Sequence, residues 1–491
     1  MPAGRGALWR AYPSVAVPVA GWHCRAKKMT KRFALIAGMA LACGLGSARA
    51  DVPFPDCPTD PAPCLLGEAE ALAGLLVVPR LHDEALFSIA AAQAGAGLID
   101  MALASVEAIE NPKTRAEAQA EVSGAAARQG DFERAHRIAL DIVDSRNRSA
   151  RVAALEVLAV EQAAAGEIDA AFATVVAIDN PYRRSEAQAA IAVSVARSGD
   201  IPGAIRTASR IATDYWFSAD QQQIKIASGL VSRSGEFDHF WFHEALAGIA
   251  AIQARGGDVV GALQTARSIP DLAGRSRAMG RVAIAQAEAG DLAGALESAS
   301  WIEAAFGDLD AMVAIAAGTA AAGDAEGALA TAREIEAAYG DVSGLTAVAI
   351  ALARRGGFDD ARAIADSIPA GEGRSRAFAG IARELALAGR LDDALAVLAR
   401  VPDPRERLVA AEGMAVTLAA TGRSGEARRI ADEVAKARAH DDMIIAITGA
   451  QAGSGDVDGA IAGALGIEDI LSRAIALADI ARALGERPTT E

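Results

Sequence analysis

The stretch AEAGDLAGALESASWI (Ala287–Ile302) returns 33 residues later as AAAGDAEGALATAREI (Ala320–Ile335). An alanine follows the glycine of this phrase by five residues, and Ile or Val follows it by twelve. The glycines that anchor the phrase at this period are Gly290, Gly323, Gly356, Gly389, Gly422 and Gly455, and upstream the pairs Gly97/Gly130 and Gly166/Gly199. A period of 20–50 residues maintained over such a length predicts a solenoid.

Each repeat has the pattern of two helices. In RSRAFAGIARELALAG (Arg374–Gly389) apolar residues recur at helical spacing, and Gly389 is suited to a left-handed helix terminus. A second helix over Leu391–Val401 is stopped by the prolines of PDP at 402–404. Short connections between the two favour antiparallel hairpins that stack side by side.

The repeat resembles the tetratricopeptide repeat. Ile381 and Ala382 fall where that family has its Leu-Gly pair, Gly389 and Ala394 match its glycine and following small residue, and Leu398 takes the place of a later aromatic residue. The opening tryptophan of the family is absent, and the second helix is shorter. The resemblance implies a right-handed superhelix with a concave groove for protein segments. Another α-solenoid, such as a HEAT-like array, is the alternative.

The predicted fold is therefore an all-α, right-handed α-solenoid of about twelve antiparallel hairpins, spanning residues 65–491. An open solenoid needs helices that cover the apolar faces of its two ends. The sequence offers Leu65–Val78 and Ile470–Leu484 for these two caps.

Residues 1–50 contain no acidic residue and read as an N-terminal extension followed by a secretory signal peptide at 29–50. Lys31 and Arg32 precede a short apolar run, and cleavage is expected after Ala50. A lipid anchor on Cys43 is the alternative. The signal peptide predicts a periplasmic or secreted protein without a membrane span.

Without residues 1–50 the chain keeps 40 basic and 63 acidic side chains, a formal net charge of −23. Such a surface disfavours nucleic acid as a partner. Two cysteines remain, Cys57 and Cys64, in a Pro-rich leader at 51–64. In an oxidising compartment this pair predicts a structural disulfide.

A second regularity is basic. An arginine lies six residues after the repeat-ending Ile or Val in seven repeats: Arg115, Arg148, Arg184, Arg275, Arg374, Arg407 and Arg473. A ladder of this kind suits an anionic ligand. It equally suits a structural role, in which each arginine caps carbonyl groups of the preceding helix.

The period fails between Gly199 and Gly257, where Gly235 is the next glycine of the anchor type. Gly257 follows Gly235 after only 22 residues, eleven fewer than one period, which predicts a shortened or absent helix within an irregular segment at 212–245. Seven aromatic residues gather there and predict either a plug for the gap or a contact patch. The partner-binding candidates in this segment are Tyr215, Trp216, Phe217, His239, Phe240, Trp241 and His243.

No motif for nucleotide binding or nucleophilic catalysis is present, and His239 and His243 lack a third metal ligand. No metal, cofactor or catalytic residue is therefore predicted. The first functional hypothesis is a scaffold or adaptor that binds an extended or helical protein segment. The alternative is an envelope glycan-binding protein or helical carbohydrate-active enzyme. It would use Trp216 and Trp241 beside one of Asp214, Asp220, Asp238 or Glu244.

Overall fold

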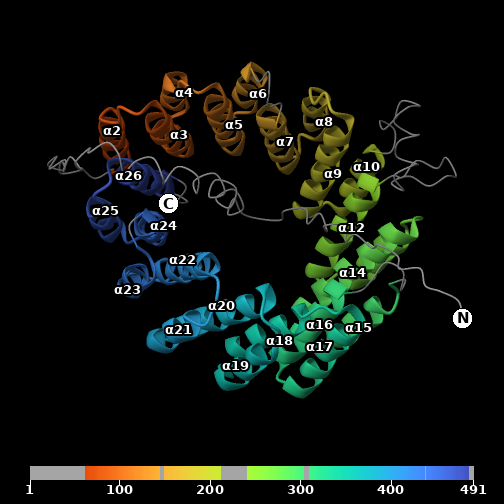
Figure 1. Cartoon of the computed structure of the whole chain (residues 1–491). Helices are drawn as coiled ribbons and strands as arrows, with labels where there is room; N and C mark the ends of the chain where they lie inside the picture. Colours follow the sequence, from red (N-terminus) through yellow and green to blue (C-terminus); the bar gives the residue numbers. More distant parts are fainter. Residues whose placement is uncertain (1–60, 144–148, 212–239, 303–308, 437, 486–491) are drawn as a thin grey trace, which may run out of the picture. The chain divides into compact units, whose positions relative to one another are not determined.

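The computed structural model describes residues 61–143, 149–211, 240–302, 309–436 and 438–485. The chain divides into the compact units Met1–Val52 and Pro53–Glu491, and all described residues belong to the second. The described ranges contain 24 α-helices and no strand (Figure 1). Within these ranges, no helix has the length and apolar character needed to cross a bilayer.

The helices alternate between a longer first helix and a shorter second helix along most of the chain. The hairpins are α3 (Pro79–Gly95) with α4 (Ile99–Ala108), α5 (Pro112–Arg128) with α6 (Phe132–Asp141), α7 (Ser149–Ala164) with α8 (Ile168–Val176), α9 (Pro181–Arg197) with α10 (Ile201–Ser209), α12 (Phe240–Arg255) with α13 (Val259–Arg267), α14 (Leu272–Glu288) with α15 (Leu292–Ala299), α16 (Leu309–Ala322) with α17 (Ala325–Tyr339), α18 (Ser343–Arg354) with α19 (Phe358–Ser367), α20 (Glu372–Leu387) with α21 (Leu391–Leu398), α22 (Pro404–Ala420) with α23 (Ser424–Val434), and α24 (Arg438–Ser454) with α25 (Val457–Leu465). The single helices α2 (Pro61–Ala73) and α26 (Ile470–Gly485) lie at the two ends.

The turn inside each hairpin is built by the repeated phrase. The described anchor glycines have φ between 79° and 109°, a left-handed conformation that favours glycine. The next residue is often aspartate, and Asp291 accepts a hydrogen bond from the backbone N of Gly294 at 3.0 Å to cap the second helix. A Cβ at Gly294 would lie 2.2 Å from the Asp291 carboxylate, so this second glycine leaves room for the cap.

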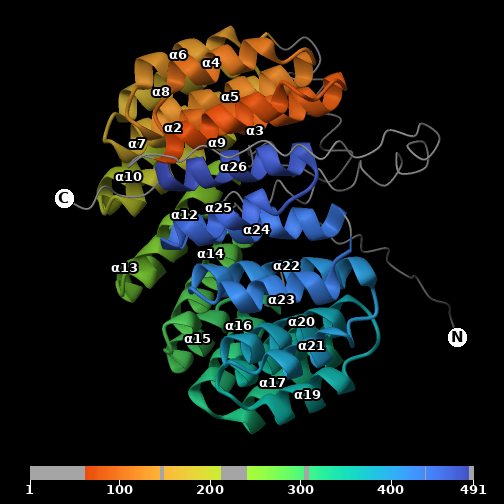
Figure 2. The same cartoon turned by 90° about the vertical axis from the view of Figure 1, so that its left-hand side faces the viewer.

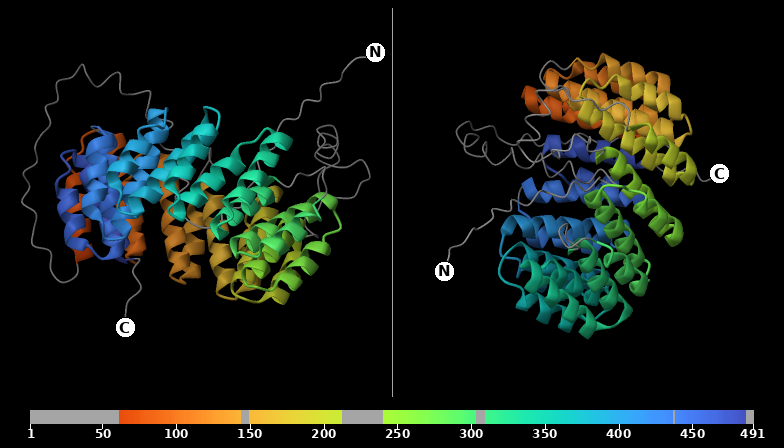
Figure 3. Two further views of the ribbon diagram at one scale, coloured as in Figure 1. Left: turned by 90° about the horizontal axis from the view of Figure 1, so that it is seen from below. Right: turned by 90° about the vertical axis from the view of Figure 1, so that its right-hand side faces the viewer.

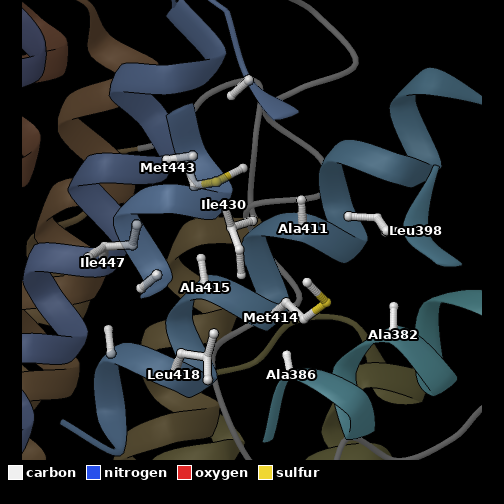
Figure 4. Close-up of a cluster of buried hydrophobic side chains, with 14 of the residues drawn as sticks. Ala382, Ala386, Leu398, Ala411, Met414, Ala415, Leu418, Ile430, Met443 and Ile447 are labelled. Atoms are coloured by element: carbon white, nitrogen blue, oxygen red, sulfur yellow. The ribbon is translucent and has the colours of Figure 1, made fainter. Parts of the chain in front are cut away.

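The hairpins form two layers. Each first helix packs on the first helices before and after it, and each second helix covers its own first helix and the next one (Figures 1 and 2). Buried alanines let neighbouring helices approach closely, and larger side chains such as Met414, Leu418 and Ile447 fill the space between them (Figure 4). The all-α solenoid predicted from the period is therefore confirmed.

The two ends of the array meet, contrary to the expectation of two separate caps. Helix α26 packs on α2 and α3 as well as on α24, and Figures 1 to 3 show the N-terminal and C-terminal helices side by side. One buried cluster contains Leu65 and Leu72 of α2, Ile89 of α3 and Leu477 of α26. Each end thus covers the apolar face of the other, and the array is closed in its contacts.

The described helices on either side of the irregular segment keep the regular packing of the array. Helix α12 packs directly on α9 and α10, as every other first helix packs on the preceding hairpin. The 58 residues between Gly199 and Gly257 are therefore one period with 25 extra residues, not two periods with a deletion. The extra length falls between α10 and α12, largely in 212–239, outside the described residues.

Candidate functional site

The arginine ladder serves the scaffold. Six of its members donate to the backbone carbonyl of the Ile or Val six residues earlier, and Arg148 lies outside the described residues. The hydrogen bonds run from Arg115 Nε to Ile109 (2.8 Å), Arg184 Nη2 to Ile178 (2.9 Å), Arg275 Nη1 to Ile269 (3.3 Å), Arg407 Nη2 to Val401 (2.8 Å) and Arg473 Nε to Ile467 (2.8 Å), and from Arg374 to Ile368. The structural interpretation of these arginines is confirmed.

The aromatic candidates at the start of α12 divide into described and undescribed residues. Tyr215, Trp216, Phe217 and His239 lie outside the described residues. Trp241 is only 6% exposed, and its ring lies edge-on to those of Tyr182 at 5.3 Å and Phe240 at 5.1 Å. Its indole N–H has no hydrogen-bond acceptor among the described residues. Trp241 is thus packed as a core side chain between α9 and α12.

His243 is also buried, and its Nδ1 lies 3.9 Å from Asp271 Oδ2 at the start of α14. The adjacent Glu244 points its carboxylate to arginines rather than to His243. Within the described residues, no three His, Cys, Asp or Glu side chains are grouped closely enough to hold a metal ion. His239, the other half of the histidine pair, lies outside them.

The buried carboxylate of Glu244 forms ion pairs with two arginines. Its side chain is 5% exposed and accepts from Arg277 Nε at 2.7 Å and Arg281 Nη2 at 2.5 Å, both on α14. A buried carboxylate requires such partners, because its desolvation is otherwise unfavourable. The Arg277 side chain is 40% exposed, and its guanidinium lies 5.1 Å from the centre of the Phe240 ring. Glu244 therefore holds two guanidinium groups at the surface in a defined orientation.

A second ionic group lies on α7 and α9. Arg183 bridges Glu156 at 2.9 Å and Glu186 at 2.6 Å. Burial raises the pKa of Glu156 to about 7, against the opposing effect of Arg183. Burial, with Glu186 nearby, also raises the pKa of Tyr182.

The two ionic groups meet at Tyr182, which is 44% exposed and within electrostatic range of Glu244. Together they form one surface across four consecutive first helices, which we name the α7–α14 surface. It consists of Glu156, Tyr182, Arg183, Glu186, Glu244, Arg277 and Arg281.

Sequence reasoning named Glu244 of this surface but missed its other members: Glu156, Tyr182, Arg183, Glu186, Arg277 and Arg281. One signal was available, because the position thirteen residues before the anchor glycine is acidic in several repeats, as at Glu186 and Glu244, and is basic at Arg277. A change of charge at a repeated position marks a place where a neighbouring repeat can form an ion pair.

The comparisons with known proteins stand beside this geometry. No family model matches the chain, and no curated protein matches it significantly. Among solved structures, Ton1535 from Thermococcus onnurineus NA1 is similar with a TM-score of 0.23 and 16% identity over 72% of this chain and 95% of that one. A circular tandem repeat protein with a novel repeat topology has a TM-score of 0.14 and 13% identity over 86% of this chain and 96% of its own.

The class of protein follows from the helices themselves: the chain is an all-α helical-repeat protein. The described members of the glycan alternative do not form a stacking platform, since Trp241 is buried and Glu244 is paired with two arginines. The remaining members, Trp216 among them, lie outside the described residues.

Proposed function

We propose that the protein is a repeat scaffold or adaptor of the tetratricopeptide-like kind, which binds an extended or helical segment of a partner protein. The α7–α14 surface is the contact that we assign to this partner. The observation that supports the assignment most is the pairing of Glu244 with Arg277 and Arg281, since Glu244 also lies within electrostatic range of the half-exposed Tyr182.

Tyrosine and arginine are the side chains that contribute most to protein interfaces when they are held rigidly. Here the side chains of Arg277 and Arg281 are 40% and 27% exposed, so each guanidinium has its acid partner on one side and solvent on the other. A partner with carbonyl or carboxylate groups can pair with the remaining N–H donors without first ordering these side chains. This pre-organisation lowers the entropic cost of binding.

We further propose that the scaffold acts in the periplasm or outside the cell, after cleavage at Ala50. The support is the sequence of residues 29–50. The predicted Cys57–Cys64 disulfide belongs to the same proposal, and Cys57 lies outside the described residues. We do not propose glycan binding, because no described residue favours it.

The test is affinity capture from an envelope extract with the chain that begins at Asp51, compared with its Tyr182→Ala variant. We expect a partner whose recovery falls about tenfold in the variant, the size of a typical interface hot spot. Tyr339→Ala is the matched control, because Tyr339 is 47% exposed but lies at the end of α17. Equal recovery by both variants, with unchanged melting temperatures, would exclude the α7–α14 surface as the contact.

A further inference from the structure

Helix α2 packs in the position that the second helix occupies in the other repeats. Each second helix from α4 to α25 packs on its own first helix and on the next first helix. Helix α2 packs on α26 and α3 in the same way, and α26 and α3 also pack directly on each other. Helix α26, as a first helix, and helix α2, as its second helix, therefore form a twelfth hairpin, although almost the whole chain separates them in sequence.

The sequence of α2 has the register of a second helix. Ala69 and Leu76 are seven residues apart, the spacing of the alanine and the closing Ile or Val in each repeat. A proline follows Leu76 by three residues, at Pro79, as Pro112 follows Ile109. The backbone N of Leu76 donates to the carbonyl of Ala73 at 3.0 Å, and Ile109 makes the equivalent bond to Val106 at 3.2 Å.

The contact that holds α2 is mainly apolar. The side chains that α2 buries in the cluster shared with α3 and α26 are Leu65, Leu66, Ala69, Leu72 and Ala73, each between 0% and 3% exposed. At its edge, Gln93 of α3 donates to Glu70 of α2 at 2.6 Å. The opposite face is open, since a Cβ at Gly67 would meet no atom within 4 Å, and Val77 in the connection to α3 is 91% exposed.

The cleft that receives α2 does not depend on α2 alone for its shape. Helices α26 and α3 approach so closely that a Cβ at Gly485 would lie 2.7 Å from the Cα of Ala96. Glu84 of α3 also lies within electrostatic range of Arg438 and Asp442 of α24. The contact between α26 and α3 leaves the same cleft as the contact between any two consecutive first helices.

We propose that the cleft between α26 and α3 is a helix-binding site, which holds α2 reversibly and accepts segment 61–77 as a separate peptide. The ligand is an amphipathic helix with the small and apolar pattern of a second helix, and its occupant in the folded protein is α2 of the same chain. This site is distinct from the α7–α14 surface and stands without the function proposed for that surface.

The test uses the full chain with a site-specific protease sequence inserted after the exposed Val77. After the folded protein is cleaved, we expect the fragment that ends at Val77 to co-elute with the rest of the chain in gel filtration. Excess fluorescent peptide 61–77 then replaces it and binds saturably with one peptide per chain. The uncleaved protein binds the peptide at least about tenfold more weakly, because its tethered α2 competes at a high effective concentration.

Two variant peptides test the geometry. Leu66→Glu places a charge on the buried face and weakens binding by about ten- to a hundredfold. Gly67→Glu places the same charge on the open face and leaves binding unchanged. The proposal fails if the fragment separates on cleavage and no peptide binds, or if the two variants bind equally. A dimer that carries the labelled fragment on a second chain would overturn the assignment of α2 to its own chain.

Discussion

Each described arginine of the ladder closes one repeat by donating to a carbonyl group at the end of a second helix. The last carbonyls of a helix have no partner within that helix, so they need one from outside. In Arg407 the guanidinium supplies two donors, Nε at 3.1 Å and Nη2 at 2.8 Å, to the single carbonyl of Val401. A positive charge at a helix C-terminus is also favourable to the helix dipole. The arginine recurs with the repeat because each second helix ends in carbonyl groups that need a hydrogen-bond donor.

Glu156 makes the stability of the protein depend on pH. Its pKa is about 7 in the folded chain, raised by burial above the ordinary value of 4.5. Below pH 4.5 the carboxyl is protonated in both the folded and unfolded states, so it contributes nothing. Between 4.5 and 7 the folded state keeps the proton and the unfolded state loses it, so the free energy of unfolding falls as pH rises. The loss is complete above pH 7.

We therefore expect Glu156→Gln to exceed the wild type in free energy of unfolding by about 1–2 kcal/mol at pH 8, and to match it near pH 4. Urea denaturation at a series of pH values measures the difference. Glu161→Gln, five residues along the same helix, is the control and should follow the wild type throughout. A constant offset between Glu156→Gln and the wild type from pH 5 to pH 8 would contradict the assignment.

At the scale of the helix pair, four hairpins share a buried polar bond between their two helices. A Ser or Thr of the second helix donates to a Gln of the first, as Ser105 to Gln93 (2.8 Å), Thr174 to Gln162 (2.7 Å), Thr265 to Gln253 (2.7 Å) and Ser298 to Gln286 (2.5 Å). The same two positions hold Leu385 and Val397 in the hairpin α20–α21, and both are buried. Both positions are therefore polar in these four hairpins and both are apolar in α20–α21.

Substitutions in α14 and α15 test this coupling. Gln286→Leu alone strands the buried Ser298 hydroxyl, and Ser298→Val alone strands the Gln286 carbonyl, so each should cost about 1–3 kcal/mol of unfolding free energy. The double variant reproduces the α20–α21 pair, and we expect it to recover most of the loss. A double-mutant cycle in urea measures the coupling. Additive losses would show that the two positions act independently.

At the scale of the whole array, contact between its first and last described helices replaces caps. An open stack of hairpins leaves an apolar face at each end, whereas here α26, α2 and α3 cover one another. The backbones come closest at Gly485 and Ala96, where a side chain at 485 has no space. The closure of the array thus depends on a glycine at the end of the last described helix.

Gly485→Ala should weaken this closure. The added Cβ would lie 2.7 Å from the Cα of Ala96, which is backbone and cannot move alone, so we expect a loss of about 1–3 kcal/mol. Amide exchange should become faster in α2 and α3 and remain unchanged in α18. Gly449→Ala in α24 is the control, because its Cβ meets nothing within 4 Å, and it should stabilise by about 0.5–1 kcal/mol. Equal stabilisation by both would show that the ends do not meet there.

The candidate site was predictable only in part. Trp241 and His243 drew attention because aromatic residues and histidine are rare in this chain, and Glu244 because it follows them directly. Their burial was not visible, because it depends on Tyr182 of α9 and on the arginines of α14, which are distant in sequence. For the same reason, the interval from Gly199 to Gly257 was interpreted from the sequence as two periods with a deletion. Only the packing of α12 on α9 showed it to be an insertion.

The sequence by itself determined the hairpins, their antiparallel pairing and their order, because helix periodicity, the left-handed glycines and the prolines act over a few residues and recur with each period. The tertiary structure alone decided that the array closes and that α2 completes the repeat begun by α26. The physical reason is that the turn from one hairpin to the next is a small angle set by side-chain packing. The sum of these angles along the array decides whether the last helix returns to the earliest described helices. No local sequence pattern encodes that sum.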